Sequence, residues 1–125
     1  MTHLDLAGNP LGAAGGAWVG RALMTSAVRE LNLSETGMNA QGAGAIGQAL
    51  RVNAHLQLLD LSKNDLYRGV LAIASALDEN GCLTSLNLAD TSLGQDDLGH
   101  FLEPMKANKT LLDLQAPSEA ANANQ

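Results

Sequence analysis

Leucines return along the chain at a nearly constant interval, and each time two of them enclose a polar residue. The first leucines of successive triplets lie about 27 residues apart, a spacing within the range of known solenoid repeats. The four triplets are Leu4-Asp5-Leu6, Leu31-Asn32-Leu33, Leu59-Asp60-Leu61 and Leu86-Asn87-Leu88. Alternation with a period of two is typical of a strand that buries one face. Self-similarity at the longer period predicts a repeat architecture in which one strand from each copy stacks on the next.

A helical segment is expected between successive triplets. In the second copy Ala43, Ile46 and Leu50 are three and four residues apart, so they share one face of a helix. The corresponding stripe of the first copy contains Trp18, Val19, Ala22 and Leu23.

The later copies depart from this pattern in two places. The third copy is one residue short in the turn before its helix, and a loop accommodates such a deletion at little cost. In the fourth copy Pro104 falls inside the expected helix. Because proline removes one backbone hydrogen bond, it predicts a kinked or shortened helix there.

Each copy reads Leu-x-Leu-x-x-(Asn or Thr)-x-(Leu or Met), then a turn, then a helix that ends in leucine. The turn position alternates between amide and hydroxyl residues, in the order Asn9, Thr36, Asn64 and Thr91. This pattern resembles the leucine-rich repeat family, and its long period and helical half resemble the ribonuclease-inhibitor-like subclass. The resemblance implies an α/β fold, a curved solenoid with parallel strands on the concave side and helices on the convex side.

The repeats extend over residues 1–115, which we expect to form one domain of about four repeats and a final strand. The register of that strand is ambiguous. Leu114 lies one repeat length after Leu86, whereas Leu112-Asp113-Leu114 imitates the triplet two residues earlier. Residues 116–125 contain no large apolar residue, so a disordered tail is predicted.

The turn residues have an expected structural role. Amide side chains of Asn9 and Asn64 should hydrogen-bond backbone groups of a neighbouring copy, because buried polar groups need partners. Thr36 and Thr91 continue the same turn ladder in the other copies.

Polar residues between the leucines face away from the core and form a column. Two interpretations of this column stay open: a solvated face that keeps the sheet soluble, or an acidic strip that binds a ligand. Asp113 is the expected fifth member of the column. The candidate partner-binding residues, which include two neighbouring glutamates, are Asp5, Glu30, Asn32, Glu35, Asp60 and Asn87.

Net charge narrows the choice of partner. The chain has 13 acidic and 7 basic residues, a net charge of −6, which speaks against nucleic acid and anionic membranes and favours a protein with a basic surface. No apolar run approaches the roughly 20 residues that span a bilayer. With one cysteine, Cys82, expected as a buried thiol, and no secretory signal pattern, a cytoplasmic location is predicted, or a host cytosol for a bacterial effector.

Catalytic, cofactor and metal sites are not expected. His3, His55 and His100 fall at different repeat positions. Asp96 and Asp97 precede His100 at helical spacing, but acidic residues at a helix start more often serve the helix dipole than a metal ion. The sequence therefore predicts no enzyme activity of the chain alone.

The resemblance implies a non-catalytic protein–protein interaction module that binds its partner through a concave, acidic strand face. The alternative is the recognition arm of a larger enzyme or regulator, such as an effector ubiquitin ligase or a small-GTPase activator. In an activator Arg29 would be the candidate arginine, although an ordinary surface role is the stronger interpretation. Turnover of GTP by a panel of small GTPases distinguishes the two functions.

No polar cap precedes the first copy. Leu4, Leu6 and Leu11 would leave an apolar end in water, since each repeat of a solenoid is covered by its neighbours. Either the chain is part of a longer array or this face meets a partner, and the isolated chain is predicted to self-associate through its N-terminal end.

Overall fold

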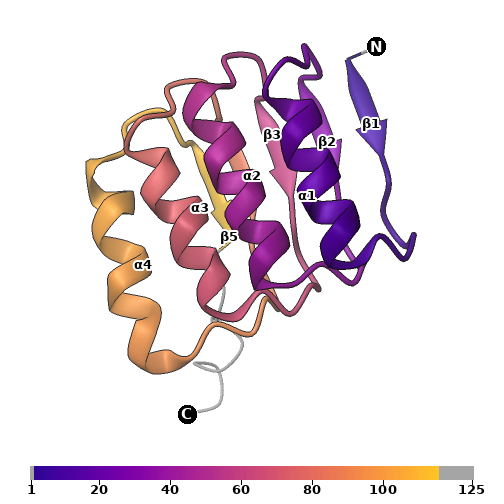
Figure 1. Ribbon diagram of the computed structural model, residues 1–125. Helices are drawn as coiled ribbons and strands as arrows, with labels where there is room; N and C mark the ends of the chain where they lie inside the picture. Colours follow the sequence, from indigo (N-terminus) through magenta and orange to yellow (C-terminus); the bar gives the residue numbers. More distant parts are fainter. Residues whose placement is uncertain (1, 116–125) are drawn as a thin grey trace.

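Strands and helices alternate along the chain in a computed structural model that describes residues 2–115 (Figure 1). The strands are β1 (His3–Asp5), β2 (Glu30–Asn32), β3 (Leu58–Asp60), β4 (Ser85–Asn87) and β5 (Asp113–Gln115). The α-helices are α1 (Gly12–Leu23), α2 (Ala40–Val52), α3 (Val70–Leu77) and α4 (Gln95–Ala107). The tail predicted over 116–125 lies outside the described residues.

The five strands form one parallel sheet whose order follows the chain, from β1 to β5. The helices all cover the same face of this sheet, and the other face is open (Figure 1). Because helices are wider than strands, the open face lies on the concave side of the array. The predicted leucine-rich repeat solenoid is confirmed.

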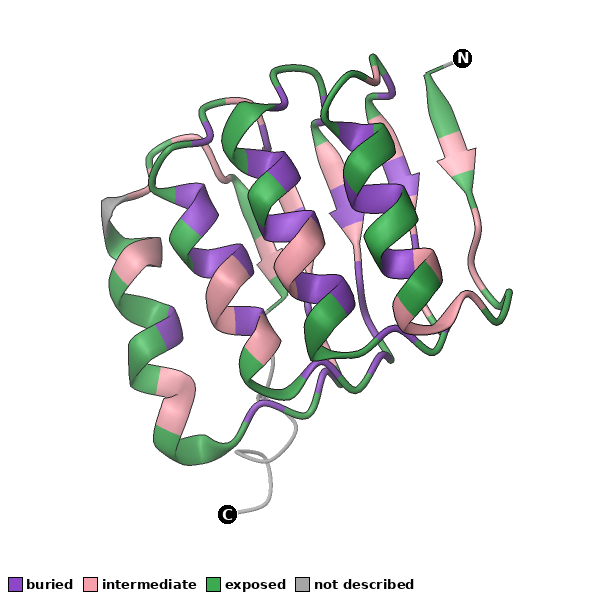
Figure 2. Ribbon diagram, viewed as in Figure 1, coloured by how far each residue is buried: buried purple, intermediate pink, exposed green. Residues whose placement is uncertain are grey.

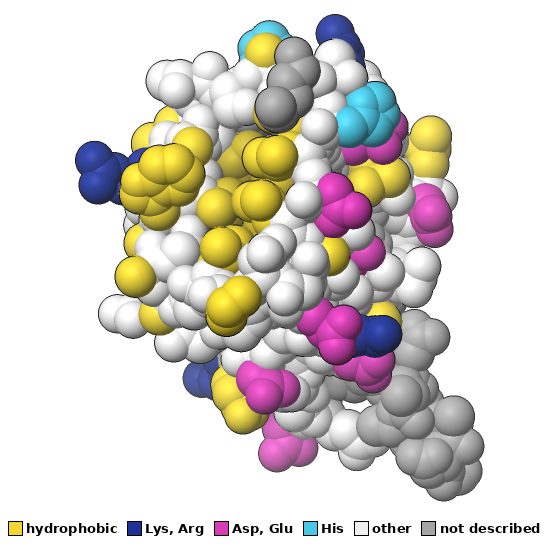
Figure 3. Space-filling view, turned by 90° about the vertical axis from the view of Figure 1, so that its right-hand side faces the viewer, with side chains coloured by type: hydrophobic (Ala, Val, Ile, Leu, Met, Phe, Trp, Pro, Cys, Tyr) yellow, Lys and Arg dark blue, Asp and Glu magenta, His cyan; other side chains and the backbone are white. Residues whose placement is uncertain are grey.

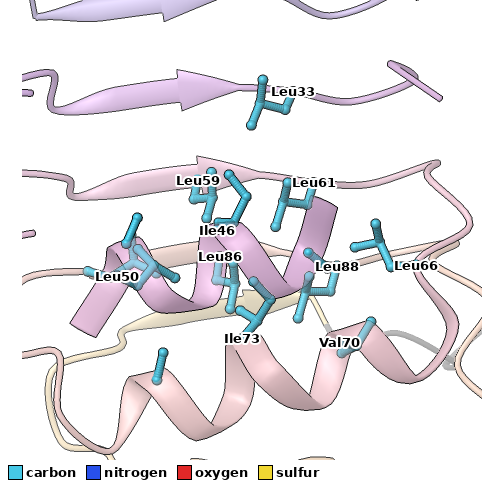
Figure 4. Packing of buried hydrophobic residues seen from close by; sticks show 14 of the residues in the cluster. Leu33, Ile46, Leu50, Leu59, Leu61, Leu66, Val70, Ile73, Leu86 and Leu88 are labelled. Atoms are coloured by element: carbon cyan, nitrogen blue, oxygen red, sulfur yellow. The ribbon is translucent and has the colours of Figure 1, made fainter. Parts of the chain in front are cut away.

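The core lies between the sheet and the helices. Leu59 and Leu61 are 0% exposed, and Ile46 and Ile73 of the neighbouring helices pack against the same cluster (Figure 4). Burial falls at the first repeat, where β1 has no buried residue and its Leu4 is half-buried (Figure 2).

Only some residues of the apolar stripe predicted for helix α1 are buried. Val19 and Leu23 are buried, whereas Trp18 is 70% exposed and Ala22 is exposed. In the described part of the chain, no repeat lies on the outer side of α1 to cover Trp18.

Small residues set the distance between neighbouring helices. A Cβ atom added to Gly16 would lie 2.7 Å from the Cα atom of Gly42, and one added to Gly47 would lie 2.8 Å from the carbonyl oxygen of Ala72. The helix backbones are therefore in direct contact, a geometry that larger side chains at these positions would prevent.

The register of the last strand is resolved by its pairing. Leu114 pairs with Leu86 and Gln115 with Asn87, so the spacing of one repeat length holds. The fifth member of the outward central column is therefore Gln115, and the assignment of Asp113 to that column was wrong. Asp113 pairs instead with Ser85, one column away.

Two further expectations change. Helix α4 contains Pro104 and still has 13 residues, as many as α2, so of the two predicted effects, a kink or a shortening, the shortening does not occur. Cys82 is of intermediate exposure rather than buried.

The short third repeat enters α3 through a 3-10 turn, Tyr67–Gly69.

Two glycines of α2 test the helix contact. Gly47→Ala should lower the free energy of unfolding by about 1–3 kcal/mol, because the added methyl group meets backbone of α3. Gly44→Ala, with open space around it, should raise the free energy of unfolding by about 0.5–1 kcal/mol through helix propensity. Urea unfolding measures the free energy of unfolding of both variants. Equal changes in the two variants would contradict the close contact between the helices.

Candidate functional site

The open face of the sheet presents two columns of outward side chains, and a third follows the strand ends. Strand pairing places the first column as His3, Glu30, Leu58, Ser85 and Asp113. The central column is Asp5, Asn32, Asp60, Asn87 and Gln115. The third, two residues beyond the central column, is Ala7, Ser34, Ser62 and Ala89. Small side chains in the third column leave the strand ends approachable.

The charge of this face is acidic. Its carboxylates come from Asp5, Glu30, Asp60 and Asp113, and none of the five strands contains Lys or Arg. His3 lies beside Glu30, with 3.0 Å between Nε2 and Oε2. Their side chains are 65% and 45% exposed, so this contact contributes little to stability.

Each Asp or Asn of the central column also closes a local turn. Its Oδ1 accepts the backbone N–H two residues later, with distances of 3.0, 3.0, 2.9 and 3.0 Å for the pairs Asp5 and Ala7, Asn32 and Ser34, Asp60 and Ser62, and Asn87 and Ala89. Both residue types supply this oxygen, so either fits the position. This role was not predicted from the sequence, although the Asp/Asn preference at strand ends is its signal.

Glu35 lies in the turn after β2 and not on a strand. It is exposed, has a φ of 52°, and donates its N–H to the Ser62 carbonyl oxygen at 3.2 Å. The equivalent residues of the next copies, Lys63 and Asp90, share the positive φ. Since Lys63 has the opposite charge, this row is not uniformly acidic, unlike the strands.

The turn residue Asn64 joins two repeats and is 2% exposed. Its Oδ1 accepts the N–H groups of Thr36 and Met38 at 3.0 and 3.1 Å, and its Nδ2 donates to the carbonyl oxygens of Leu33 and Leu61 at 2.9 and 3.0 Å. Four backbone groups are thus satisfied by one side chain.

The other turn residues bond to carbonyl oxygens of their own copy, and the Thr36 hydroxyl also lies 3.2 Å from the Asn64 Oδ1 atom. Thr36 and Thr91 donate their hydroxyls to the carbonyl oxygens three residues earlier, at 2.9 and 2.7 Å. Asn9 is exposed and donates to the Leu6 carbonyl oxygen at 3.1 Å. Asn9 and Asn64 therefore share a repeat position but differ in burial.

A second ladder of asparagines, missed as such in the sequence, lies after the helices. Asn80 donates to the Leu50 carbonyl oxygen at 2.8 Å and accepts from the N–H groups of Cys82 and Leu83 at 2.9 and 2.8 Å. Asn53 and Asn108 make the same kinds of bond one repeat before and after. Their even spacing along the chain, one repeat length from each to the next, was the available signal.

The open face is hollowed at its N-terminal end. A depression of about 280 Å³ is lined by His3, Leu4, Asp5, Glu30, Leu31, Asn32 and Leu58. Its polar groups are mainly hydrogen-bond acceptors, which suit the ammonium, guanidinium or amide groups of a partner.

The other candidate functional residues do not form a common site. Among residues 2–115, no three His, Cys, Asp or Glu side chains come together as a metal site, and Asp97 is 3.2 Å from the Arg68 Nε atom. Arg29 is exposed just before β2. None of the helices within the described residues has the length and apolar character needed to cross a bilayer.

The two asparagines of the turn position provide a matched test of the ladder. Asn64→Ala should lower the free energy of unfolding by about 1–3 kcal/mol or more, because it leaves buried N–H groups without a partner. Asn9→Ala removes one exposed bond and should cost less than about 1 kcal/mol. Thermal or urea unfolding distinguishes them, and equal losses would contradict the inter-repeat role of Asn64.

Comparisons with known proteins agree with this geometry. A family model described as Leucine Rich repeat matches residues 1–17 and 52–74. The structure of "Leiomodin-1 Actin-Binding Site 2 (ABS2)" is 26% identical, with a TM-score of 0.88 over 99% of this chain and 75% of that chain. The tropomodulin C-terminal domain of Caenorhabditis elegans is 12% identical, with a TM-score of 0.81 over 99% and 78%. No curated protein sequence matches.

The ribonuclease-inhibitor-like subclass is compatible with these likenesses. The regular repeat of the leucine triplets, the parallel sheet and the matched family model all describe one architecture. The chain is a leucine-rich repeat protein.

Proposed function

We propose that the chain is a non-catalytic protein-interaction module whose concave strand face binds a basic surface of a protein partner. The observation that carries this proposal is the charge of the five strands, which present four carboxylates and no Lys or Arg. A parallel sheet with one open face offers a broad binding surface.

The turns of the central column support this function by holding the carboxylates in place. Asp60 accepts bonds from both the N–H and the hydroxyl group of Ser62, at 2.9 and 2.6 Å. A side chain that is already ordered loses less conformational entropy on binding. Because the carboxylates are partly exposed, they act mainly by steering association.

Actin is the first defined partner to test. The matched leiomodin-1 structure is named for an actin-binding site, and its likeness extends over 99% of this chain at 26% identity. Actin binding is therefore the second candidate function. A cytoplasmic location accompanies this proposal and is supported by the single, unpaired cysteine.

Neutralising the face should weaken binding without unfolding the protein. In the double variant Asp60→Asn and Glu30→Gln, asparagine retains the Oδ1 acceptor for Ser62, so stability should change by no more than about 0.5 kcal/mol per site. Purified monomeric actin, and proteins retained from a lysate at low salt, should bind the parent more tightly than this variant. The difference should shrink as salt rises.

The control removes the same charge from the helix layer, as Asp78→Asn with Asp96→Asn. Both aspartates are exposed, one at the end of α3 and one in the first turn of α4. This control should retain the parent's partners. If the strand-face variant and the control bind alike at low salt, the concave face is only a solvated surface, and the helices or ends become the candidates.

A further inference from the structure

The N-terminal end of the solenoid carries an apolar groove between β1 and α1. Hydrophobic side chains gather around it in the end-on view (Figure 3). The groove has a volume of about 70 Å³, and Leu4, Leu6, Trp18, Val19 and Leu23 are among the residues that line it. Trp18, 70% exposed, is the largest exposed side chain of this end.

Trp18 is a large residue at a repeat position that is occupied by alanine in the interior helices α2 and α3. Its repeat position is that of Ala45 in the next copy and of Ala72 in the copy after that. Ala45 and Ala72 each face a glycine of the preceding helix, and a Cβ atom added there would lie 2.8 Å from their carbonyl oxygens. Trp18 is too large for that spacing, so a repeat packed at the interior distance does not fit over α1.

The edge of β1 has its own hydrogen-bonding pattern. The Thr2 carbonyl oxygen accepts from the Glu30 N–H, and the Leu6 N–H donates to the Asn32 carbonyl oxygen, both at 2.9 Å. Even-numbered residues therefore point their backbone groups at β2. Because the direction alternates along a strand, the N–H and C=O groups of His3 and Asp5 point to the open edge.

This edge is complementary to itself. If a second copy pairs antiparallel about Leu4, His3 of each copy stands opposite Asp5 of the other, and both are hydrogen-bonded pairs. The imidazole and the carboxylate of each pair then lie on the same face of the sheet, where the imidazole N–H can hydrogen-bond to the carboxylate. A parallel pairing would offer no such symmetric match.

We propose that two copies of the chain form a two-fold dimer through the β1 edges, which joins their sheets and encloses both grooves. The two α1 helices then lie side by side on the same layer, with both Trp18 side chains at the interface between them. The same patch is used by both copies, so the interface is isologous and association closes at the dimer.

The single tryptophan reports directly on this interface. Sedimentation of the full chain from about 1 to about 300 μM should show a monomer–dimer equilibrium, and the Trp18 emission maximum should move to longer wavelength as dilution separates the copies. Trp18→Gln should weaken dimerisation by about tenfold or more. Val52→Gln, at a side chain that is 62% exposed on α2, should leave it unchanged.

A charge exchange tests the antiparallel register. His3→Asp alone places carboxylates opposite each other, and Asp5→His alone places imidazoles opposite each other, so each should weaken the dimer. The double variant restores one acid opposite one imidazole and should dimerise more tightly than either single variant. Circular dichroism confirms that each variant is folded.

Three results would overturn the proposal. A monomer throughout this concentration range would assign the groove to another occupant. A dimer insensitive to Trp18→Gln, with unchanged emission on dilution, would place the interface elsewhere. Oligomers that grow beyond the dimer would indicate head-to-tail stacking instead.

Discussion

Buried amide side chains connect each repeat to the one before it, and the rest of the architecture depends on them. The strands have only three residues each, so many backbone groups of a repeat lie in turns that neither strand pairing nor a helix satisfies. Asn64 satisfies such groups before the helices, and Asn53 and Asn80 satisfy them after the helices, at exposures of 2%, 6% and 5%. The second and third repeats are therefore joined at both ends of their strands, and the other neighbouring repeats are joined after their helices. Leucine burial follows from that register.

Because turn residues join the repeats, two other surfaces are left for binding. Because the inter-repeat bonds lie in the turns, the outward residues of the strands are available for recognition. The Asp and Asn residues of the central column need one oxygen for their own turn, and an aspartate retains a second oxygen and its charge. The other surface is the apolar groove at the N-terminal end of the described solenoid, which Trp18 and residues of β1 line.

The repeat explains how much could be predicted from the sequence. Strand positions, the sheet order and the helical face of Ile46 and Leu50 all follow from a hydrophobic pattern that recurs in every copy. The repeat pattern could not predict features that occur only once in the chain or that depend on which element lies beside a residue. Trp18 fits the apolar stripe of α1 by spacing, but its exposure depends on what covers the end.

The errors have the same origin. The Leu112-Asp113-Leu114 triplet imitates the repeat locally, whereas pairing with β4 places Leu114 opposite Leu86. The role of the central column in closing turns depends on backbone geometry, which residue type alone does not specify. Glu35 was predicted on the concave face, whereas the structure places it in the turn after β2, with the positive φ that Lys63 and Asp90 share. Its part in partner binding stays a prediction.

Amide hydrogen exchange tests the dependence on inter-repeat side chains most directly. The N–H groups of Thr36 and Met38 lie in a turn and donate to Asn64 of the next repeat. If the account is right, they exchange as slowly as the amides of the central strands, in the global unfolding regime. The Ala7 N–H, bonded to the exposed Asp5, should exchange much faster. Rapid exchange at Thr36 and Met38, comparable to that of Ala7, would contradict the claim that buried asparagines hold the repeats together.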